Sequence, residues 1–291
     1  MTSQTTTADA TTTTPEKDRI ARLKSAAHRI RHNALTMGEV QGQGYIGQAL
    51  GVADILAVVY ADQLRYRPED PDWEDRDRFL LSIGHYAIAL YAALAEAGTI
   101  PLEELETYGS DESRLPMSAM ASYTPGVEIS GGSLGHGLTV ATGMALGLRQ
   151  LGNPARVFNL LSDGELDEGS TWEAAMACAH HGLDNVTAIV DVNALQADGP
   201  TAGVLRTEPV LDKWRAFGWH ATRVDGNDLP ALVAAFDAAA AHSGSPSVII
   251  CDTRIGYGVP LLMEREKAHF MRVEEHEWQI ARTQLDETFT R

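Results

Sequence analysis

Residues 162–200, SDGELDEGSTWEAAMACAHHGLDNVTAIVDVNALQADGP, decide how the fold of this chain is interpreted. The stretch begins at the end of an apolar run, has a helical pattern over 168–182, and continues into VTAIVDV (186–192), a run rich in β-branched residues. Asp163 and Asn193 directly follow the two apolar runs and lie 30 residues apart, about the length of one strand–helix–strand unit. The stretch therefore predicts two parallel strands joined by a helix, each with a polar side chain at its exit.

The same alternation of helical and strand-like patterns extends over most of the chain in both directions. Helical patterns cover about 18–37, 51–64, 86–97, 138–150, 168–182 and 229–242, and short apolar runs typical of buried strands cover 78–83, 156–161, 186–192, 220–224 and 247–253. Strands that alternate with helices predict an α/β fold with a mainly parallel, doubly wound sheet. Ligands in such folds bind outside the carboxyl ends of the strands, where this sequence repeatedly places Gly, Ser, Asp and Asn.

Composition excludes several classes of function. The 291 residues contain 23 Lys and Arg against 40 Asp and Glu, a net charge of −17, which disfavours binding to nucleic acid or to anionic membranes. No run of 18 apolar residues is present, so we expect no membrane span. Cys178 and Cys251 lie far apart without metal-ligand spacing, which disfavours disulfides and a zinc site and makes the reducing cytoplasm the expected location.

The first residues differ in composition from the rest of the chain. Residues 1–15 read MTSQTTTADATTTTP, with almost no large apolar side chain to bury. They also lack the basic segment and apolar core of a secretory signal. We expect a disordered Thr-rich tail over 1–17 and a single domain over 18–291.

Asp163 and Asn193 are also candidate metal ligands. Carboxylate and amide oxygens suit Mg²⁺ or Ca²⁺, and Mg²⁺ commonly combines one or two protein ligands with phosphate oxygens. Gly164, directly after the Asp, would allow close approach of a phosphate group to the backbone. Spacing alone leaves a second interpretation open, in which the Asp and the Asn belong to two unrelated turns.

The sequence of residues 162–200 resembles the thiamine-diphosphate motif of the transketolase family, which begins Gly-Asp-Gly and ends in Asn about 30 residues later. Ser162 replaces the first Gly. The resemblance implies a thiamine-diphosphate-binding fold of the diphosphate-domain type. It also assigns roles within the motif: Asp163, Asn193 and the backbone carbonyl of Leu195 hold Mg²⁺ (or Ca²⁺), Asn193, Gly164 and Glu165 contact the cofactor, and Glu168 links the two active sites of a dimer.

Three further segments resemble the family in the same order along the chain. Residues 82–98 match its Gly-His segment, 125–147 its Gly-rich cofactor loop, and 252–271 a segment that ends in a catalytic His. The resemblance implies that His85 and His269 are the acid–base or orienting groups of the site. It further implies that His85 and the loop residues Gly132, Ser133 and Leu134 contact the cofactor.

Two departures from the family pattern concern the donor substrate. Tyr45 stands where the family has a His, and Ser118 or Ala119 stands where a second His is usual. In transketolases these histidines contact hydroxyl groups of the donor ketose. Because an unpaired buried polar group costs about 1–3 kcal/mol, we expect a donor other than an ordinary ketose phosphate, such as pyruvate or another 2-oxo acid or diketone.

The family mechanism also needs a glutamate from a second, pyrimidine-binding domain, for which this chain has no candidate. The resemblance therefore implies the N-terminal subunit of a split transketolase, a transferase that moves a two-carbon ketol or acyl unit to an aldehyde acceptor. Its partner would be a C-terminal transketolase-like subunit that carries the Glu, in an α2β2 heterotetramer. Two alternatives remain: the α-subunit of a 2-oxo acid dehydrogenase, and a non-catalytic regulatory subunit.

Overall fold

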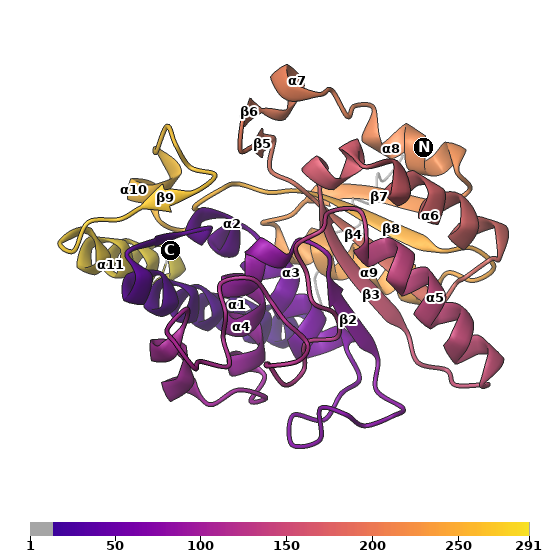
Figure 1. The fold of residues 1–291 in the computed structure, drawn as a ribbon, viewed down its shortest axis with the longest axis horizontal. Helices are drawn as coiled ribbons and strands as arrows, with labels where there is room; N and C mark the ends of the chain where they lie inside the picture. Colours follow the sequence, from indigo (N-terminus) through magenta and orange to yellow (C-terminus); the bar gives the residue numbers. More distant parts are fainter. Residues whose placement is uncertain (1–13, 291) are drawn as a thin grey trace, which may run out of the picture.

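A five-stranded parallel sheet forms the centre of the molecule (Figure 1). The computed structural model describes residues 14–290. The strands run in the order β2-β3-β4-β8-β7, and every neighbouring pair is parallel. Their bounds are β2 (Arg78–Leu81), β3 (Val157–Ser162), β4 (Val186–Val192), β7 (His220–Asp225) and β8 (Ser247–Asp252). The predicted α/β fold with a parallel sheet is confirmed.

Both faces of the sheet are buried, as a parallel sheet requires. Along β3 and β4, Leu160 and Ile189 belong to one hydrophobic core, and their chain neighbours Leu161 and Val190 belong to a second core. Successive side chains of a strand point to opposite faces, so runs without polar interruption supply both cores. This is why the strand runs of the sequence are apolar throughout.

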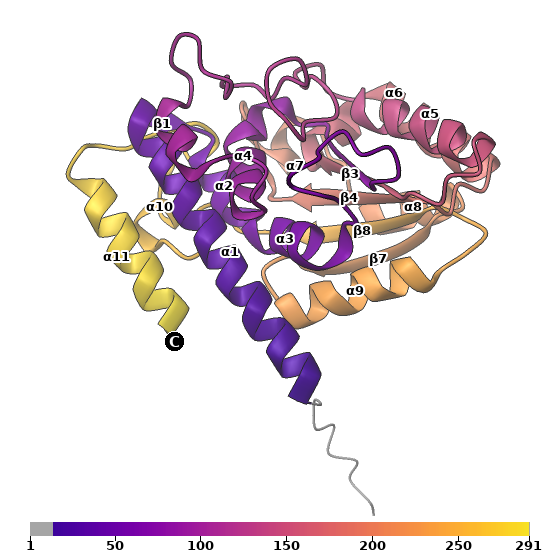
Figure 2. The same cartoon turned by 90° about the horizontal axis from the view of Figure 1, so that it is seen from below.

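Helices cover the two faces in the pattern of a doubly wound fold (Figure 2). One face carries α5 (Gly137–Gln150), α6 (Gly169–His180) and α8 (Val210–Ala216), and the other carries α9 (Leu229–Ala241), α1 (Thr14–Gln41), α3 (Ala53–Val58) and α4 (Ala87–Glu96). The chain passes from β4 to the edge strand β7 and then returns to β8. Because crossovers are right-handed, reversing direction moves the connecting helix α9 to the opposite face.

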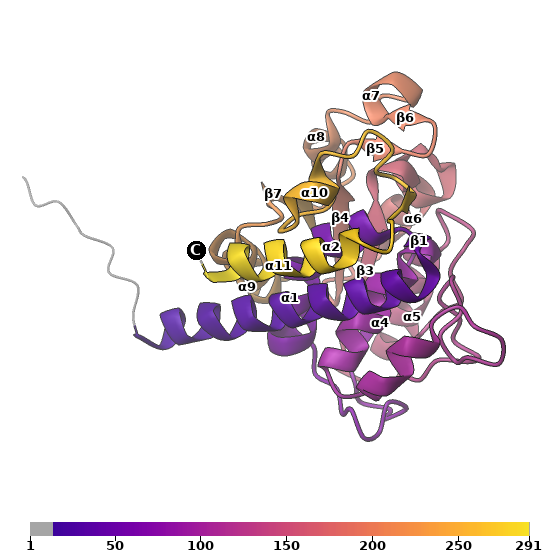
Figure 3. The same ribbon diagram turned by 90° about the vertical axis from the view of Figure 1, so that its left-hand side faces the viewer.

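Short elements and one long helix complete the fold and were not predicted. The short elements are β1 (Gln43–Gly44), α2 (Ile46–Gly51), β5 (Leu195–Gln196), β6 (Gly199–Pro200), α7 (Thr201–Val204), α10 (Pro260–Met263) and β9 (Met271–Arg272). Short 3₁₀ or π helices are η1 (Val59–Gln63), η2 (Gly84–Tyr86), η3 (Leu102–Thr107) and η4 (Asp163–Asp167). The long helix α11 (Glu277–Thr290) lies beside α1 (Figure 3). The predicted helix over 51–64 is divided into α3 and the π-helical turn η1, with Gly51 at the end of α2.

The N-terminal boundary lies earlier than the expected residue 18. Helix α1 begins at Thr14, so residues 14–17 of the predicted tail are helical, and residues 1–13 lie outside the described part of the chain. Cys178 and Cys251 are both buried free thiols. Among the residues described, no helix is long and apolar enough to cross a membrane.

Candidate functional site

A cavity of about 250 Å³ lies at the carboxyl ends of β3 and β4. Its walls include six residues that the sequence analysis singled out for the site: His85, Leu134, Asp163, Gly164, Leu195 and His269. They come from four distant segments of the chain. Tyr45, one of the two positions expected to depart from the family pattern, is part of the same wall.

Asp163 leaves β3 and is almost fully buried beneath the cavity, at 2% exposure. Its Oδ2 accepts hydrogen bonds from the backbone N–H of Ala194 (3.0 Å) and from the hydroxyl of Thr201 (2.9 Å). Burial, and secondarily the like charge of Asp191, raise the pKa of Asp163 to about 7. The carboxylate is therefore held in place in an environment that disfavours its charge.

Asn193 is oriented by a buried network at the end of β4. Its Nδ2 donates to Asp191 Oδ2 (2.8 Å) and to the hydroxyl oxygen of Tyr86 (2.8 Å). The Tyr86 hydroxyl in turn donates to Asp191 (2.9 Å), and Thr253 donates to the other oxygen of the same carboxylate. These contacts fix which end of the Asn193 amide carries the oxygen, and Oδ1 accepts from the backbone N–H of Leu195 (3.0 Å).

Sequence reasoning missed Asp191, Tyr86, Thr253 and Thr201, which position the predicted ligands. One signal was present, since Asp191 is a charged residue inside the otherwise apolar run 186–192. A fully buried charge is rare unless it is paired. The partners of Asp191 come from segments 105 and 62 residues away, so no local pattern identifies them.

The turn that joins Asn193 to Leu195 is strained. Ala194 has φ +62°, a left-handed conformation that costs an L-residue about 1–2 kcal/mol. The conformation directs the Ala194 N–H to Asp163, which links the residue after β3 to the turn after β4. Strain of this kind persists where the surrounding structure overdetermines it, as at ligand sites.

This donor set fits a hard divalent cation. Asp163 and Asp191 are 2% and 0% exposed, and within residues 14–290 neither forms an ion pair with Lys, Arg or His. The Asp163 carboxylate, with the Asn193 amide oxygen and the Leu195 carbonyl nearby, offers oxygen ligands, and buried Asp191 adds a second acidic group beside them. Mg²⁺ supplies the opposite charge and prefers such ligands.

Three aromatic rings also line the cavity. The Tyr45 ring lies 4.4 Å from His85 and 5.4 Å from His269, measured between ring centroids, and the two imidazoles are 6.0 Å apart. Burial, and to a lesser degree His269, lower the pKa of His85 to about 4, and burial also lowers the pKa of His269. Both imidazoles are therefore neutral at pH 7.

The Gly-rich loop packs directly on the exit of β2. A Cβ atom at Gly84 would lie 2.4 Å from the carbonyl carbon of Gly131, so neither position has room for a side chain. The Ala119 N–H donates to Gly84 O (3.1 Å), and its carbonyl accepts from Gly131 N–H (2.9 Å). Ala119 is fully buried and Ser118 is half-buried, so of these two residues only Ser118 is partly accessible.

The other predicted residues occupy different positions around the cavity. Gly132 and Ser133 are exposed on the loop, outside the wall that Leu134 forms. Glu165 is 1% exposed and accepts hydrogen bonds from Ser82 Oγ, Gly135 N–H (2.8 Å) and Ser162 N–H (3.4 Å). Through these hydrogen bonds, Glu165 connects the exit of β2, the Gly-rich loop and η4. Glu168 is exposed at the molecular surface.

The family follows from comparison with known sequences. A family model described as "Transketolase, thiamine diphosphate binding domain" matches residues 23–289. The chain belongs to the transketolase family. The thiamine-diphosphate-binding fold that the motifs predicted is thereby confirmed.

Individual relatives agree with this assignment. A transketolase family protein of Sinorhizobium fredii is 64% identical over 257 residues, which cover 88% of this chain and 92% of that protein. The 6-deoxy-6-sulfo-D-fructose transketolase subunit of a Clostridium species is 38% identical, with 91% and 96% covered. Transketolase from Leishmania mexicana superposes with a TM-score of 0.85 at 30% identity; the match covers 92% of this chain but only 41% of that one.

Proposed function

We propose that this chain is the N-terminal, diphosphate-binding subunit of a two-component transketolase that depends on thiamine diphosphate and Mg²⁺ and transfers a two-carbon unit to an aldehyde-type acceptor. The observation that carries the proposal is the convergence of Asp163 and Leu195 on one cavity with His85 and His269, with Asn193 hydrogen-bonded to the wall residue Leu195. Buried Asp163, which lies beside Asp191 and has no cationic partner among residues 14–290, supports the need for a cation, and the family supports the cofactor.

In this proposal each residue has a distinct role. Asp163, the Asn193 amide oxygen and the Leu195 carbonyl hold Mg²⁺, and Gly164 lets the diphosphate approach the backbone. When bound, thiamine diphosphate supplies the nucleophilic carbon that breaks and forms the carbon–carbon bonds. Leu134 packs against the cofactor, Gly132 and Ser133 contact it from the loop entrance, and Glu165 supports the loop. Exposed Glu168 reaches the second active site of the assembly.

His85 and His269 act as neutral imidazoles. Since the pKa of His85 is about 4, its ring is uncharged throughout the neutral range and accepts or donates one hydrogen bond at each nitrogen. A neutral ring suits proton transfer at a substrate hydroxyl or carbonyl oxygen better than a fixed cation does. The Gln48 amide, 3.2 Å from His269 Nδ1, holds the second ring in place.

The partner is a C-terminal transketolase-like subunit that contributes the catalytic Glu, and the assembly is an α2β2 heterotetramer. Two relatives of similar length are named as transketolase subunits, and this chain covers 96% and 90% of them. The test is to isolate the tagged chain from its native host and identify co-purifying chains by mass spectrometry. Recovery as a homo-oligomer that is fully active with cofactor would overturn the two-component arrangement.

The donor is proposed to lack the hydroxyl pattern of an ordinary ketose phosphate, with pyruvate or another 2-oxo acid as the leading candidates. The support is Tyr45, whose ring fills the space beside His85 where the family has a polar, titratable group, together with the small Ser118. A relative is named for 6-deoxy-6-sulfo-D-fructose, a ketose with a changed substituent, so a modified ketose is the second candidate.

The donor experiment uses the two-subunit complex with Mg²⁺ and thiamine diphosphate. Acceptor-dependent consumption of pyruvate, of fructose 6-phosphate and of a 6-deoxyketose is compared for the unchanged protein and for Tyr45→His. We expect the substitution to shift preference toward fructose 6-phosphate. Preferential use of fructose 6-phosphate by the unchanged complex would overturn the donor proposal. Cofactor binding without turnover of any donor would instead favour a non-catalytic subunit.

A further inference from the structure

The C-terminal helix α11 brings a carboxylate to two histidines of α1, away from the cofactor cavity. Figures 2 and 3 both show α11 running alongside α1. His28 and His32 are one turn apart on α1, so they lie on the same helix face. As isolated sequence positions they are indistinguishable from surface histidines, because the carboxylate comes from Asp286, more than 250 residues later.

Both imidazoles point at one oxygen of Asp286. His32 Nε2 is 2.8 Å and His28 Nε2 is 3.1 Å from Asp286 Oδ1. The three candidate ligand atoms all lie within 4.8 Å of one another, and this is the one group of at least three His, Cys, Asp or Glu with such spacing among the described residues. Ligands about 2.0–2.1 Å from a tetrahedral Zn²⁺ are separated by about 3.3 Å, which is close to the two His–Asp286 distances. Binding of the ion would set the separation of the two imidazole nitrogens by side-chain rotation.

Packing holds the first ring in position. The His28 ring stacks on Phe289 (4.2 Å between centroids) and meets His32 edge to face (4.6 Å). Its Nδ1 is buried without a hydrogen-bond partner, so the ring's polar contact is made through Nε2. A ligand whose rotamer is already fixed loses little entropy on binding a metal.

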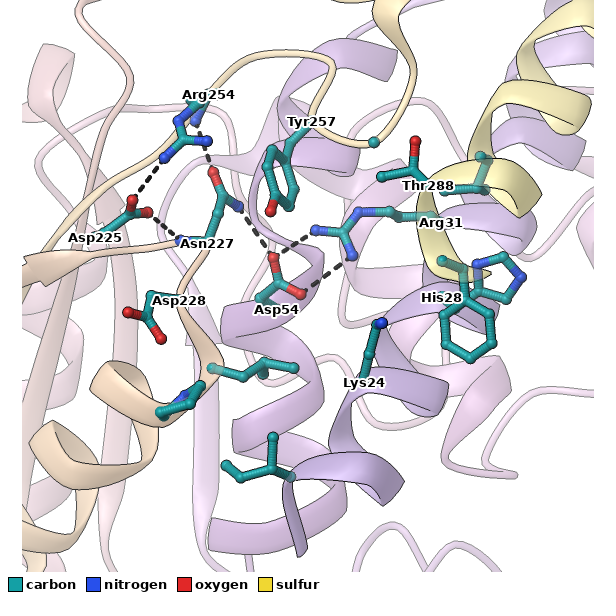
Figure 4. A pocket seen from close by; sticks show the side chains of 16 residues that line it. Lys24, His28, Arg31, Asp54, Asp225, Asn227, Asp228, Arg254, Tyr257 and Thr288 are labelled. Atoms are coloured by element: carbon teal, nitrogen blue, oxygen red, sulfur yellow. Dashed lines mark hydrogen bonds and ion pairs between the residues drawn. The ribbon is translucent and has the colours of Figure 1, made fainter. Parts of the chain in front are cut away.

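Two neighbouring arginines are already paired with carboxylates within the protein. His28 stands at one end of a second hollow, of about 380 Å³, between α1, α9 and α11 (Figure 4). In that hollow Arg31 is paired with Asp54 (2.5 Å) and Arg254 with Asp225 (2.6 Å). Asp286 is free of such an arginine and has only the two histidines as ion-pair partners among residues 14–290.

We propose that His28, His32 and Asp286 bind a Zn²⁺ ion, with water in the fourth position. Two imidazole nitrogens and one carboxylate oxygen suit Zn²⁺ and disfavour Mg²⁺, which prefers oxygen ligands. The side chain of Asp286 is 61% exposed, which leaves solvent access for the water and for entry of the ion. Bound zinc would join the C-terminal half of α11 to α1.

The test is Zn²⁺ titration of the full, untagged chain by calorimetry, with excess Mg²⁺ and thiamine diphosphate present to fill the cofactor site. We expect one Zn²⁺ per chain. His32→Gln and Asp286→Asn, both at partly or largely exposed positions, should each weaken binding at least about tenfold, since loss of even an indirect support of a metal ligand has that effect.

The matched control is the double substitution His180→Gln/His181→Gln, which removes another pair of neighbouring imidazoles whose rings are 5.0 Å apart. It should leave Zn²⁺ affinity unchanged. Zinc X-ray absorption should show two imidazole ligands in the unchanged protein. Binding that survives both His32→Gln and Asp286→Asn, or that is lost in the control, would overturn the assignment.

Discussion

Asp54 and Asp163 are both buried carboxylates, and the contrast between their surroundings separates the framework of this protein from its site. Asp54 is 4% exposed and meets the guanidinium of Arg31 through two contacts of 3.1 and 2.5 Å, with Asn227 as a further donor at 3.1 Å (Figure 4). Asp163 is 2% exposed and faces Asp191 instead of a cation. A buried carboxylate that is paired with an arginine of the same chain is structural. A buried carboxylate without such a partner is suited to bind a cation.

The largest effect on stability is expected when the Arg31–Asp54 ion pair is broken. Asp54→Asn leaves the Arg31 guanidinium buried without its counter-charge and should lower the free energy of unfolding by about 3–5 kcal/mol. Urea denaturation of the chain measures it. Cofactor affinity of the folded fraction should be unchanged.

The control for this prediction is the double substitution Arg31→Met/Asp54→Leu, which removes both charges and should be less destabilising than the single one. A loss below about 1 kcal/mol for Asp54→Asn would mean that this pair is not a structural element of the fold.

The corresponding change at the other carboxylate should act on ligand binding and not on folding. Asp163→Asn should leave the unliganded chain as stable as before or more stable, because it relieves the repulsion from Asp191. It should weaken binding of Mg²⁺ and thiamine diphosphate by about a hundredfold, about 2.7 kcal/mol, by removing a charged ligand. Calorimetry on both proteins measures the difference.

Asp198→Asn provides the same change of charge in the same cavity, at an exposed position. Its effect on cofactor affinity should be small. If Asp163→Asn instead unfolds the chain, Asp163 is a framework residue like Asp54 and the comparison fails.

The pKa of Asp163 should also make cofactor binding depend on pH. The pKa of Asp163 is raised from 3.8 unfolded to about 7 folded, so the unliganded chain loses stability as pH rises from about 4 through 7. Mg²⁺ needs the ionised form and must displace a proton below pH 7. Affinity for Mg²⁺ with thiamine diphosphate should therefore be about tenfold lower at pH 6 than at pH 8.

His85 cannot produce this dependence, because its pKa of about 4 keeps it neutral over the whole range. The rise in melting temperature caused by cofactor should accordingly be larger at pH 8 than at pH 6, and Asp163→Asn should flatten the profile. An equal rise at both pH values in the unchanged protein would contradict the role given to Asp163.

The smallest effect concerns backbone strain at the site. Ala194→Gly removes the cost of the left-handed conformation and should raise stability by about 1 kcal/mol or less while slightly weakening cofactor affinity, since the turn becomes less rigid. Glu112, the other non-glycine residue with positive φ (+64°) in the described chain, is the control. Glu112→Gly should raise stability to a similar degree without any effect on cofactor binding. If Ala194→Gly and Glu112→Gly weakened cofactor binding equally, the strain at Ala194 would have no specific role in the site.

The local pattern of the sequence was enough to predict the two site strands. The apolar runs at 156–161 and 186–192 place Asp163 and Asn193 at strand exits, and β3 and β4 end within a residue of the predicted positions. Periodicity and β-branched content are local properties, so a single sequence displays them directly. The motif resemblance added the family and the cofactor, which the family match supports.

Local pattern was not enough to predict what holds those ligands. Asp191 is buried because Tyr86 and Thr253 reach it from other segments, and Asp54 is neutralised because α1 delivers Arg31. Likewise, nothing local separates His28 and His32 from the exposed His180 and His181 until α11 places Asp286 beside them. The boundary at Thr14 was missed because the prediction rested on composition, whereas α1 begins inside the Thr-rich stretch.

The sequence by itself therefore determined the α/β class, the family and the identity of the candidate cofactor ligands, because these depend on periodicity and on residue types at fixed spacing. The tertiary structure alone decided which charges are paired within the protein, which way the Asn193 amide faces, that Tyr45 lies against His85 and His269, and that β8 lies between β4 and β7. Charge pairing and hydrogen bonding act over about 3 Å between groups that the chain separates by tens to hundreds of residues, and only the packed fold brings such groups together.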